Sequence, residues 1–398
     1  MRLLFITMLS VVCLSAEITN AQTTNDLLNL LTQKGTISKT EADSIRFEYA
    51  AKQRSSEARQ DSFPLSLGRI LRLSGYTQAR YQYYQQAGKY DEFDIRRARL
   101  DFQGDFSSKW GYRLLVDFVG STGATGTAPT GGALVSPTLL DAFIAYKPFD
   151  FLKITAGQFL IPFSVENLTQ DRNLETVDRS QVVSALVARK GDVSNGLVDS
   201  IGNQNGREMG IQLSGSLIKF QGRYLADYYI ALLDGAGINT VDNNQSKDID
   251  ARLVLHPLKI LDIGASYYNG FDRFTSSPAK NQERIRWGGE FALNYSLLSV
   301  KGEYIKGREG NSNPIVHEGW YLQGSYFFWP KHLQGVFRYD TYNPNVALSK
   351  TVETSTYYVF GLNYFFNVWT KLQVNYSRRT ENANINNDVF TAQLQLAF

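Results

Sequence analysis

The chain has 398 residues, of which 20% are charged, with a formal net charge of +3 and a mean hydropathy of -0.27. So balanced a charge implies no bulk attraction to nucleic acid, and no nucleic-acid partner is expected. Beyond the N-terminus no apolar run is long enough for a membrane-spanning helix, which excludes helical membrane proteins. The aromatic content of 13% is high for a soluble domain and suits a protein with two aromatic belts at a membrane.

Residues 1–21 have the pattern of a secretory signal peptide. Arg2 precedes an apolar run over residues 3–14, and small and polar residues follow up to Ala21, where cleavage is expected. The run is too short to span a bilayer. The single cysteine, Cys13, lies inside it, so the mature chain is expected to carry neither a disulfide nor a thiolate metal site.

Residues 22–63 have a helical pattern. Asn25 can cap a short helix over residues 26–33, Gly35 can end it, and a second helix is expected to follow. We expect a helical periplasmic segment that leads into the next domain or plugs it. A short coiled coil or a contact with the cell wall is the alternative.

From Arg69 to the C-terminus the pattern changes to a two-residue alternation of polar and apolar side chains. In RARLDFQGDF, residues 97–106, polar residues take the odd positions and apolar residues the even ones. Such a strand has one hydrophilic and one apolar face, and segments of about ten residues with this pattern are typical of transmembrane β-barrels. Residues 64–398 are therefore expected to form an all-β barrel domain in the outer membrane.

The connections favour a barrel over a soluble sandwich, because short turns alternate with long polar loops. Short turns are expected at residues 107–109, 148–150, 218–221, 256–258, 296–297, 330–331 and 367–368. Longer loops are expected at residues 86–92, 120–137, 157–206, 234–247, 271–283, 309–316, 343–352 and 381–387. Together they predict an antiparallel barrel of about sixteen strands with both termini on the periplasmic side.

The third long loop, residues 157–206, is expected to narrow the barrel. It carries Pro162, Phe163 and Leu174, and an apolar run over residues 182–188 that can form about two helical turns. So long a loop with apolar residues of its own needs a surface to pack against. We expect it to fold inward, into the lumen.

Five stretches of the chain form an ordered set: FDIRRARLDFQGDFSSKWGYRLLVDF, the AYKPF turn, GQFLIPFSVENLT followed by DRS, REMGIQLSG and DIDARLVLHP. This set resembles the phosphate-selective porin O and P family of Gram-negative outer membranes. The resemblance covers nearly all of the chain beyond the N-terminal helices. It implies a sixteen-stranded, trimeric porin with an inward-folded third loop, in which anions pass along arginine and lysine side chains.

The inward parity of the strands places many basic side chains in the lumen. The candidates for an anion pathway are Arg97, Arg99, Arg113, Arg252, Arg284, Arg286 and Lys371. Arginine suits phosphate because its planar guanidinium donates two parallel hydrogen bonds and keeps its charge. A row of such weak sites lets an anion enter and leave. Carboxylates such as Asp101 and Glu290 share these faces, so ion pairs that stiffen the wall are the alternative role.

Arg97 and Arg99 are the first choice, because two bases in succession on one inward face leave less room for full neutralisation. The candidate constriction residues of the third loop are Glu166, Arg172, Arg179 and Arg189. Their charges are mixed, so we expect Glu166, Arg172 and Arg179 mainly to pin the loop to the wall.

These features predict a porin for passive diffusion of small anions, with phosphate or polyphosphate as the expected solute. The alternative is a general or oligosaccharide-permeable porin, in which the inward aromatics Tyr76 and Tyr229 would guide sugars. A receptor barrel would need a plug, because about sixteen strands enclose an aqueous lumen, and the N-terminal helices are too short to fill it.

Neither enzymatic activity nor a cofactor is expected. The histidines His256, His317 and His332 have no serine at a suggestive position, and no cluster has metal-ligand spacing. The expected partners are permeating anions, outer-membrane lipid, further copies of the chain in a homotrimer, and the barrel-assembly machinery. That machinery reads a last strand that ends in Phe398.

Overall fold

The computed structural model describes residues 31–34, 65–119, 137–188, 193–194, 197–198, 206–274, 280–348, 354–381 and 385–398. The chain divides into two units, Met1–Ala58 and Arg59–Phe398. Apart from a helical turn at residues 31–34, the predicted signal peptide and N-terminal helices lie outside the described residues. Within the described ranges, no helix has the length and apolar character needed to cross a membrane.

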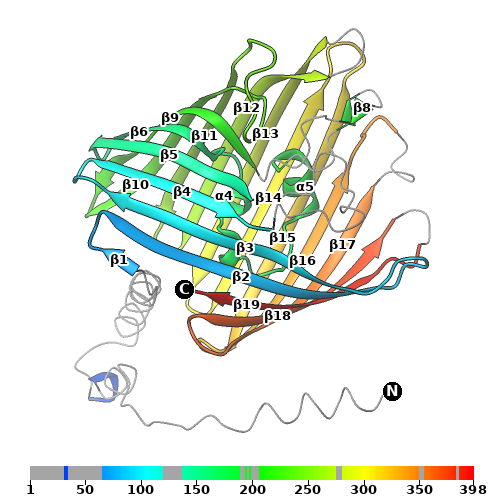
Figure 1. Cartoon of the computed structure of the whole chain (residues 1–398). Helices are drawn as coiled ribbons and strands as arrows, with labels where there is room; N and C mark the ends of the chain where they lie inside the picture. The colour runs from blue at the N-terminus through cyan, green and yellow to red at the C-terminus, as the bar shows by residue number, and fades with distance from the viewer. Residues whose placement is uncertain are drawn as a thin grey trace. The chain divides into compact units, whose positions relative to one another are not determined.

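Sixteen antiparallel strands form a closed barrel (Figure 1), which confirms the predicted fold class. They are β2 (Leu71–Tyr84), β3 (Glu92–Asp105), β4 (Trp110–Asp117), β5 (Thr138–Phe149), β6 (Leu152–Leu160), β9 (Arg207–Phe220), β10 (Arg223–Leu233), β11 (Asp248–Leu258), β12 (Leu261–Phe274), β13 (Lys280–Tyr295), β14 (Leu298–Glu309), β15 (Ile315–Trp329), β16 (Leu333–Asn343), β17 (Ser355–Phe365), β18 (Thr370–Thr380) and β19 (Val389–Ala397). Each strand pairs with the next one along the barrel, and β19 pairs with β2.

The seam between β19 and β2 closes the barrel with the last residue of the chain. The amide and carbonyl of Phe398 each bond the backbone of Gly75 at 2.9 Å. A Cβ on Gly75 would lie 2.7 Å from the Phe398 ring, so only glycine leaves room for that ring. A short strand, β1 (Leu65–Leu67), pairs with the start of β2, where β19 no longer reaches.

The predicted alternation sets which side chains face the lumen and which face lipid. On β4 the side chain of Arg113 faces the lumen, while that of the next residue, Leu114, is 44% exposed on the outer face. Large apolar residues such as Ile211 and Phe360 are more than half exposed, at 53% and 51%. An apolar outer band of this kind is what a barrel in hydrocarbon requires.

Aromatic rings gather at the short-turn end of the barrel, where one of the two expected belts would lie. The ring pairs there are Trp110 and Tyr146 (4.5 Å between centroids), Phe149 and Phe151 (5.0 Å), Tyr326 and Phe328 (5.4 Å), and Tyr364 and Phe366 (4.9 Å). Amphipathic rings at this level fit the boundary between hydrocarbon and headgroups.

Several predicted connections, among them those at residues 256–258 and 271–283, differ from the structure because strand pairing continues further than the sequence pattern suggests. The predicted turn at 256–258 belongs to β11, which after a bulge pairs with β12 as far as Leu258 opposite Leu261. The predicted loop at 271–283 is shorter, since β12 and β13 stay paired up to Phe274 opposite Lys280.

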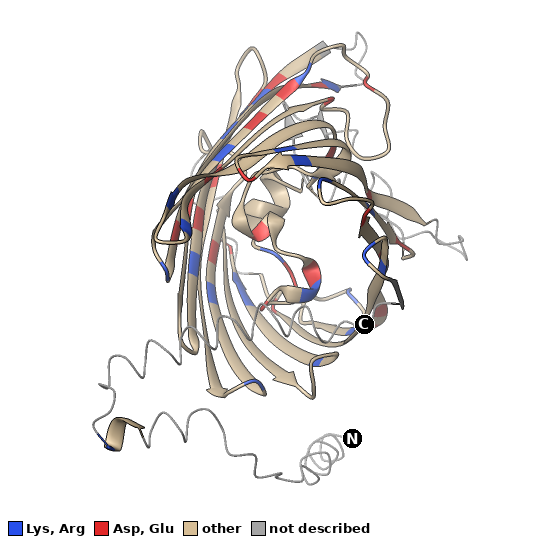
Figure 2. Ribbon diagram, turned by 90° about the vertical axis from the view of Figure 1, so that its left-hand side faces the viewer, with Lys and Arg blue, Asp and Glu red and all other residues tan. Residues whose placement is uncertain are grey.

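The third loop enters the barrel and forms short helices there (Figures 1 and 2). These are α4 (Val165–Leu168), the 3-10 helix η1 (Asp171–Asn173) and α5 (Gln181–Leu186), and a small hairpin of β7 (Val193–Ser194) and β8 (Leu197–Val198) follows. Ser164 and Ser180 cap the two α-helices, because each hydroxyl oxygen accepts a bond from the backbone amide three residues later. The predicted apolar run thus becomes α5.

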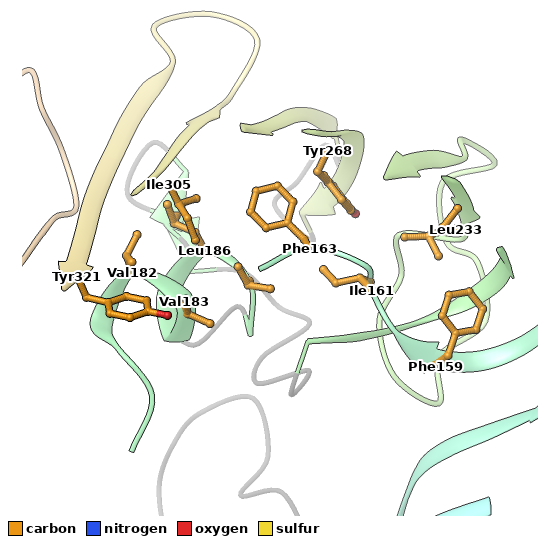
Figure 3. Close-up of a cluster of buried hydrophobic side chains, with 12 residues drawn as sticks. Phe159, Ile161, Phe163, Val182, Val183, Leu186, Leu233, Tyr268, Ile305 and Tyr321 are labelled. Carbon is orange, nitrogen blue, oxygen red and sulfur yellow. The ribbon is translucent and has the colours of Figure 1, made fainter. Parts of the chain in front are cut away.

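The apolar core lies between this loop and one side of the barrel wall. Its members are Phe159, Ile161, Phe163, Val182, Val183, Leu186, Val187, Ala231, Leu233, Tyr268, Ile305 and Tyr321. Figure 3 shows Val182, Val183 and Leu186 of α5 facing Ile305 and Tyr321 of the wall. Burial of a side chain such as Leu186 stabilises the loop by roughly 1.5–3 kcal/mol.

Inward-facing glycines on the wall make room for the loop. A Cβ on Gly307 would lie 3.4 Å from Leu186, and one on Gly319 would lie 2.9 Å from Cβ of Val182. The helix therefore lies directly on the backbone of β14 and β15.

Candidate permeation pathway

Strands β13–β18 hold the third loop, and we call them the anchoring arc. Glu175 of the loop accepts bonds of 2.6 Å from Gln323 and Ser325 and forms an ion pair of 3.2 Å with Lys301. Burial alone would raise the pKa of Glu175, but Lys301 and the hydrogen-bond donors hold it below its ordinary value. Further along the wall, the Nζ atom of Lys371 donates to the Leu174 carbonyl at 3.1 Å.

Carboxylates on the anchoring arc also accept hydrogen bonds from the first backbone amides of the loop helices. The amide of Val165 donates to Glu290 at 2.7 Å, and that of Gln181 donates to Asp340 at 2.9 Å. These amides have no partner within their own helices, so the wall satisfies them. The loop is therefore fixed by specific backbone bonds as well as by apolar packing.

Glu166 and Arg338 fix the loop to itself and to the wall. One carboxylate oxygen of Glu166 accepts bonds from the Ser180 amide and hydroxyl, at 2.9 and 2.7 Å. Arg338 of β16 donates to the Thr176 hydroxyl at 2.8 Å and lies 3.4 Å from Glu166. Glu166 is 1% exposed, which places it within the body of the loop.

The opposite side of the lumen, β2–β6 and β9, borders a narrow gap, and we call these strands the passage arc. A cavity of about 30 Å³ separates it from the loop. Its lining residues are Ser74, Gly75, Tyr76, Arg99, Asp101, Arg113, Leu115, Leu160, Thr169, Gln170, Asp171, Arg172, Arg179 and Arg207. A wider space of about 490 Å³ opens toward the short turns, and Arg113 lines both spaces.

Asp171 of η1 reaches across this gap to two arginines of β3, pairing with Arg99 and with Arg97 at 3.2 Å. It also pairs with Arg179 of its own loop. Burial would raise the pKa of Asp171, but the surrounding guanidinium groups, above all that of Arg179, hold it well below its ordinary value. The loop thus touches the passage arc through an ionised carboxylate.

The expectation that Arg97 and Arg99 are incompletely neutralised is wrong, because each of them has a carboxylate partner. Asp171 pairs with both of them, and Arg99 also pairs with Asp117 at 2.7 Å. Each is 5% exposed. The inward parity was predicted correctly, but the counter-charge comes from the loop, whose path no strand pattern shows.

Two further arginines of the narrow gap, Arg113 and Arg207, are also tied to carboxylates. Arg113 forms a two-pronged pair with Asp101, at 3.0 and 2.8 Å, and lies 2.9 Å from Asp141. Arg207 pairs with Asp141 at 2.6 Å. Sequence reasoning did not single out Arg207 or Asp171, since one begins a strand directly after the loop and the other lies in a three-residue helix.

Four predicted pathway residues face the interface between loop and wall rather than the gap. Arg252 pairs with Glu290, Arg284 with Asp272, and Arg286 with Glu309, and all three arginines are buried. Lys371 binds loop carbonyls, as described above. Lys371 therefore holds the loop, whereas the three arginines pair with carboxylates of the barrel wall.

Arg172 is the half-buried cation of the gap that keeps its charge accessible. Its Nε atom donates to the side chain of Gln170 at 2.9 Å. In the part of the chain that the structure describes, its guanidinium has no acidic partner. Arg189, the other predicted cation of the loop, lies outside the described residues.

The histidines occupy structural positions. His256 lies 2.6 and 3.2 Å from two lumen carboxylates, His317 is buried 3.6 Å from Glu309, and His332 lies 3.1 Å from the Phe365 carbonyl. Across the described ranges, no group of three or more His, Cys, Asp or Glu side chains is placed to hold a metal ion.

The sequence profile of the family described as phosphate-selective porin O and P matches residues 72–285 and 272–398. The chain belongs to this family. Membership places the barrel in the outer membrane and makes it a porin, in agreement with its lipid-facing apolar band. No curated protein matches the chain.

Solved porins share the fold of this family member at low sequence identity. The anion-selective porin from Comamonas acidovorans has a TM-score of 0.57 and 12% identity over 82% of this chain and 99% of that one. The channel DcaP of Acinetobacter baumannii has a TM-score of 0.55 and 14% identity over 85% and 99%. OmpT, an outer-membrane protein of Vibrio cholerae, gives 0.54 and 11% over 84% and 100%.

Proposed function

We propose that this porin passes small anions in preference to cations and that phosphate is among them. The observation that carries the proposal is the lining of the narrow gap. Five arginines border it, against two aspartates. In a narrow, low-dielectric passage, an excess of one sign raises the local concentration of the opposite ion.

Arg172 is the residue we assign to direct contact with the permeating anion. Its guanidinium lines the gap without an acidic partner among the described residues, so it can exchange water for an anion without breaking an ion pair. A guanidinium presents parallel donors to an oxyanion. The paired arginines around it supply a fixed positive field.

A general or oligosaccharide-permeable porin is the alternative, and the aromatic residues give it little support. The ring of Tyr76 is 8% exposed, Arg99 lies 5.8 Å from its centroid, and its hydroxyl accepts a bond from the same arginine. Arg252 lies 5.6 Å from the ring of Tyr229. Arginines thus occupy ring faces on which a sugar would need to stack.

We further propose export through the N-terminal signal peptide, insertion by the barrel-assembly machinery and assembly as a homotrimer without enzymatic activity. The family resemblance supports the trimer, and one structure of OmpT from Vibrio cholerae is described as a trimer form. The outer-membrane lipid is the expected partner of the exposed apolar band.

Single-channel recording in planar bilayers tests the proposal. The reversal potential in a KCl gradient is expected to show anion preference, and phosphate is expected to reduce the chloride current in a saturable way. Arg172→Gln should weaken both effects. Arg378→Gln is the matched control, because Arg378 is exposed on the outer face of β18.

Cation preference in the unmodified protein would refute the proposal. Anion preference without any phosphate effect would keep the anion channel and remove phosphate from its solutes. Equal effects of Arg172→Gln and Arg378→Gln would remove Arg172 from the pathway.

A further inference from the structure

The arginine site at the narrow gap holds a carboxylate that belongs to the chain itself. Oδ1 of Asp171 accepts a bond from Arg179 and lies 3.2 Å from Nη2 of Arg97, while Oδ2 accepts a bond from Arg99. The Asp171 side chain is 6% exposed. Three guanidinium groups around two oxygens form the arrangement that binds a free oxyanion.

Many contacts other than those of Asp171 hold the loop in the lumen. Glu175 bonds three groups of the anchoring arc, Gln181 bonds Asp340, and α5 is buried in the apolar core. All of these contacts lie on β13–β18 or in the core, whereas Asp171 reaches the other way, to β3. Its position is therefore explained by the passage rather than by fixation of the loop.

Two of the arginines that bind Asp171 differ in whether they have a second acidic partner. Among the described residues, Asp171 is the acidic partner of Arg97, whose other side-chain bond is with Gln78 at 2.9 Å. Arg99 keeps Asp117 if Asp171 is lost. Removal of the Asp171 carboxylate would leave a preformed cationic site open to the gap.

We propose that Asp171 is the specificity-determining residue of the constriction, a tethered carboxylate that occupies an oxyanion site and must be displaced by a permeating oxyanion. The proposal rests on the proposed anion pathway and adds its selectivity element. An anion with two or more oxygens can replace both contacts of the carboxylate. Chloride offers a single centre and competes poorly for the same donors.

Competition by a tethered group has a defined effect on affinity. A carboxylate held beside its site acts at a high effective concentration. The apparent affinity of a free anion is then reduced by the fraction of time for which the site is empty. Removal of the tethered carboxylate is therefore expected to tighten oxyanion binding on the order of tenfold or more.

The test uses the full-length protein in planar bilayers, with phosphate, formate and acetate as probes against a chloride current. Asp171→Ala is expected to gain saturable block at about tenfold lower oxyanion concentration than the unmodified protein. Asp171→Asn, which keeps the side-chain shape, is expected to show a smaller gain and serves if the alanine variant does not assemble. Block by phosphate alone, or by the carboxylates as well, supports the proposal and identifies the ligand.

Asp178→Asn is the matched control. Asp178 is a loop carboxylate, 49% exposed, that lies 3.8 and 3.3 Å from Arg80 and Arg96 and does not line the gap. An equal gain in oxyanion block in the control would mean that the effect comes from the change in net charge alone, which would overturn the proposal.

A larger conductance of Asp171→Ala with unchanged oxyanion block would show that Asp171 only pins the loop, which also overturns the proposal. Cation preference of the unmodified protein would instead refute the proposed function. If the unmodified protein prefers anions but Asp171→Ala shows no gain in oxyanion block, this inference is refuted and the proposed function stands.

Discussion

The lumen wall buries many charged side chains, and most of them have partners, but Asp250 on β11 is an exception. It is 0% exposed, and neither carboxylate oxygen has a hydrogen-bond partner within the described residues. Its neighbours across the sheet are Ala231 and Tyr268. Asp248, two positions away, accepts bonds from the Tyr268 hydroxyl and the Phe271 amide. The free-energy cost of burial is therefore larger for the Asp250 carboxyl group than for that of Asp248.

Asp250→Val is expected to raise the free energy of unfolding by about 1–3 kcal/mol, because it removes a buried carboxyl group whose oxygens lack a hydrogen-bond partner. Asp248→Asn should lower the free energy of unfolding by a similar amount, because it weakens an existing network. Urea unfolding in detergent, followed by tryptophan fluorescence, measures both variants. Destabilisation by both would contradict this account of Asp250.

The depressed pKa of Asp171 fixes the pH range in which its contact with the arginines exists. A folded-state pKa well below the ordinary value of about 3.9 means that the contribution is complete above that value and is lost only as pH falls through the folded pKa. The difference in reversal potential between the unmodified protein and Asp171→Asn should therefore be equal at pH 7 and pH 5. It should vanish only below about pH 4. Convergence of the two proteins between pH 7 and pH 5 would contradict the assignment.

At the scale of elements, the third loop depends on the shape of the wall beneath it. Gly307 faces Leu186, and the three atoms nearest to an added Cβ belong to that side chain and to Arg286, at 3.4–3.7 Å. Gly324 of β15 faces the lipid side and has nothing within that distance. Substitutions at the two glycines therefore distinguish an effect on loop packing from a general intolerance of larger residues in the barrel.

Gly307→Leu is expected to push α5 from the wall at a cost of about 1–3 kcal/mol, because the added side chain overlaps Leu186. The displaced loop should raise single-channel conductance and expose the loop to protease. Gly324→Leu should leave both readouts unchanged. If the two variants behave alike, α5 does not rest on Gly307.

Local sequence patterns predicted the strands and the inward loop of this fold well. They did not predict which residues of the loop contact which residues of the wall. The parity of β3 placed Arg97 and Arg99 inside, and the length and apolar residues of the third loop indicated that it packs inward. The partners of the loop come from distant strands, since Glu166 and Glu303 are 137 residues apart and Gln181 and Asp340 are 159 apart. The path of the loop decides which charges pair, so the residues assigned to conduction included Lys371, which binds loop carbonyls, and arginines that pair with buried carboxylates.

At the scale of the whole molecule, the barrel closes only when the last strand meets the first. Phe398 contributes two backbone bonds to Gly75 and a ring that fills the space above it. Contacts between residues so far apart in sequence form late and slowly. The final residue therefore bears on assembly as well as on stability.

Phe398→Ser is expected to reduce the amount of folded barrel in the outer membrane, with a loss of roughly 1–2 kcal/mol from the seam. Phe366→Ser is the control, because Phe366 is an aromatic of similar exposure, 41% against 39%, outside the seam. Heat-modifiable migration in gels reports the folded fraction. Equal losses in the two variants would show that any aromatic at this level is sufficient.

The division of the wall into an anchoring arc and a passage arc makes the pore eccentric. Fixation of the loop depends mainly on β13–β18, whereas the gap is lined mainly by β2–β6 and β9. The polarity of the passage can then change through substitutions on one half of the circumference while the other half keeps the channel narrow. Such a barrel can acquire new solute preferences without a corresponding loss of stability.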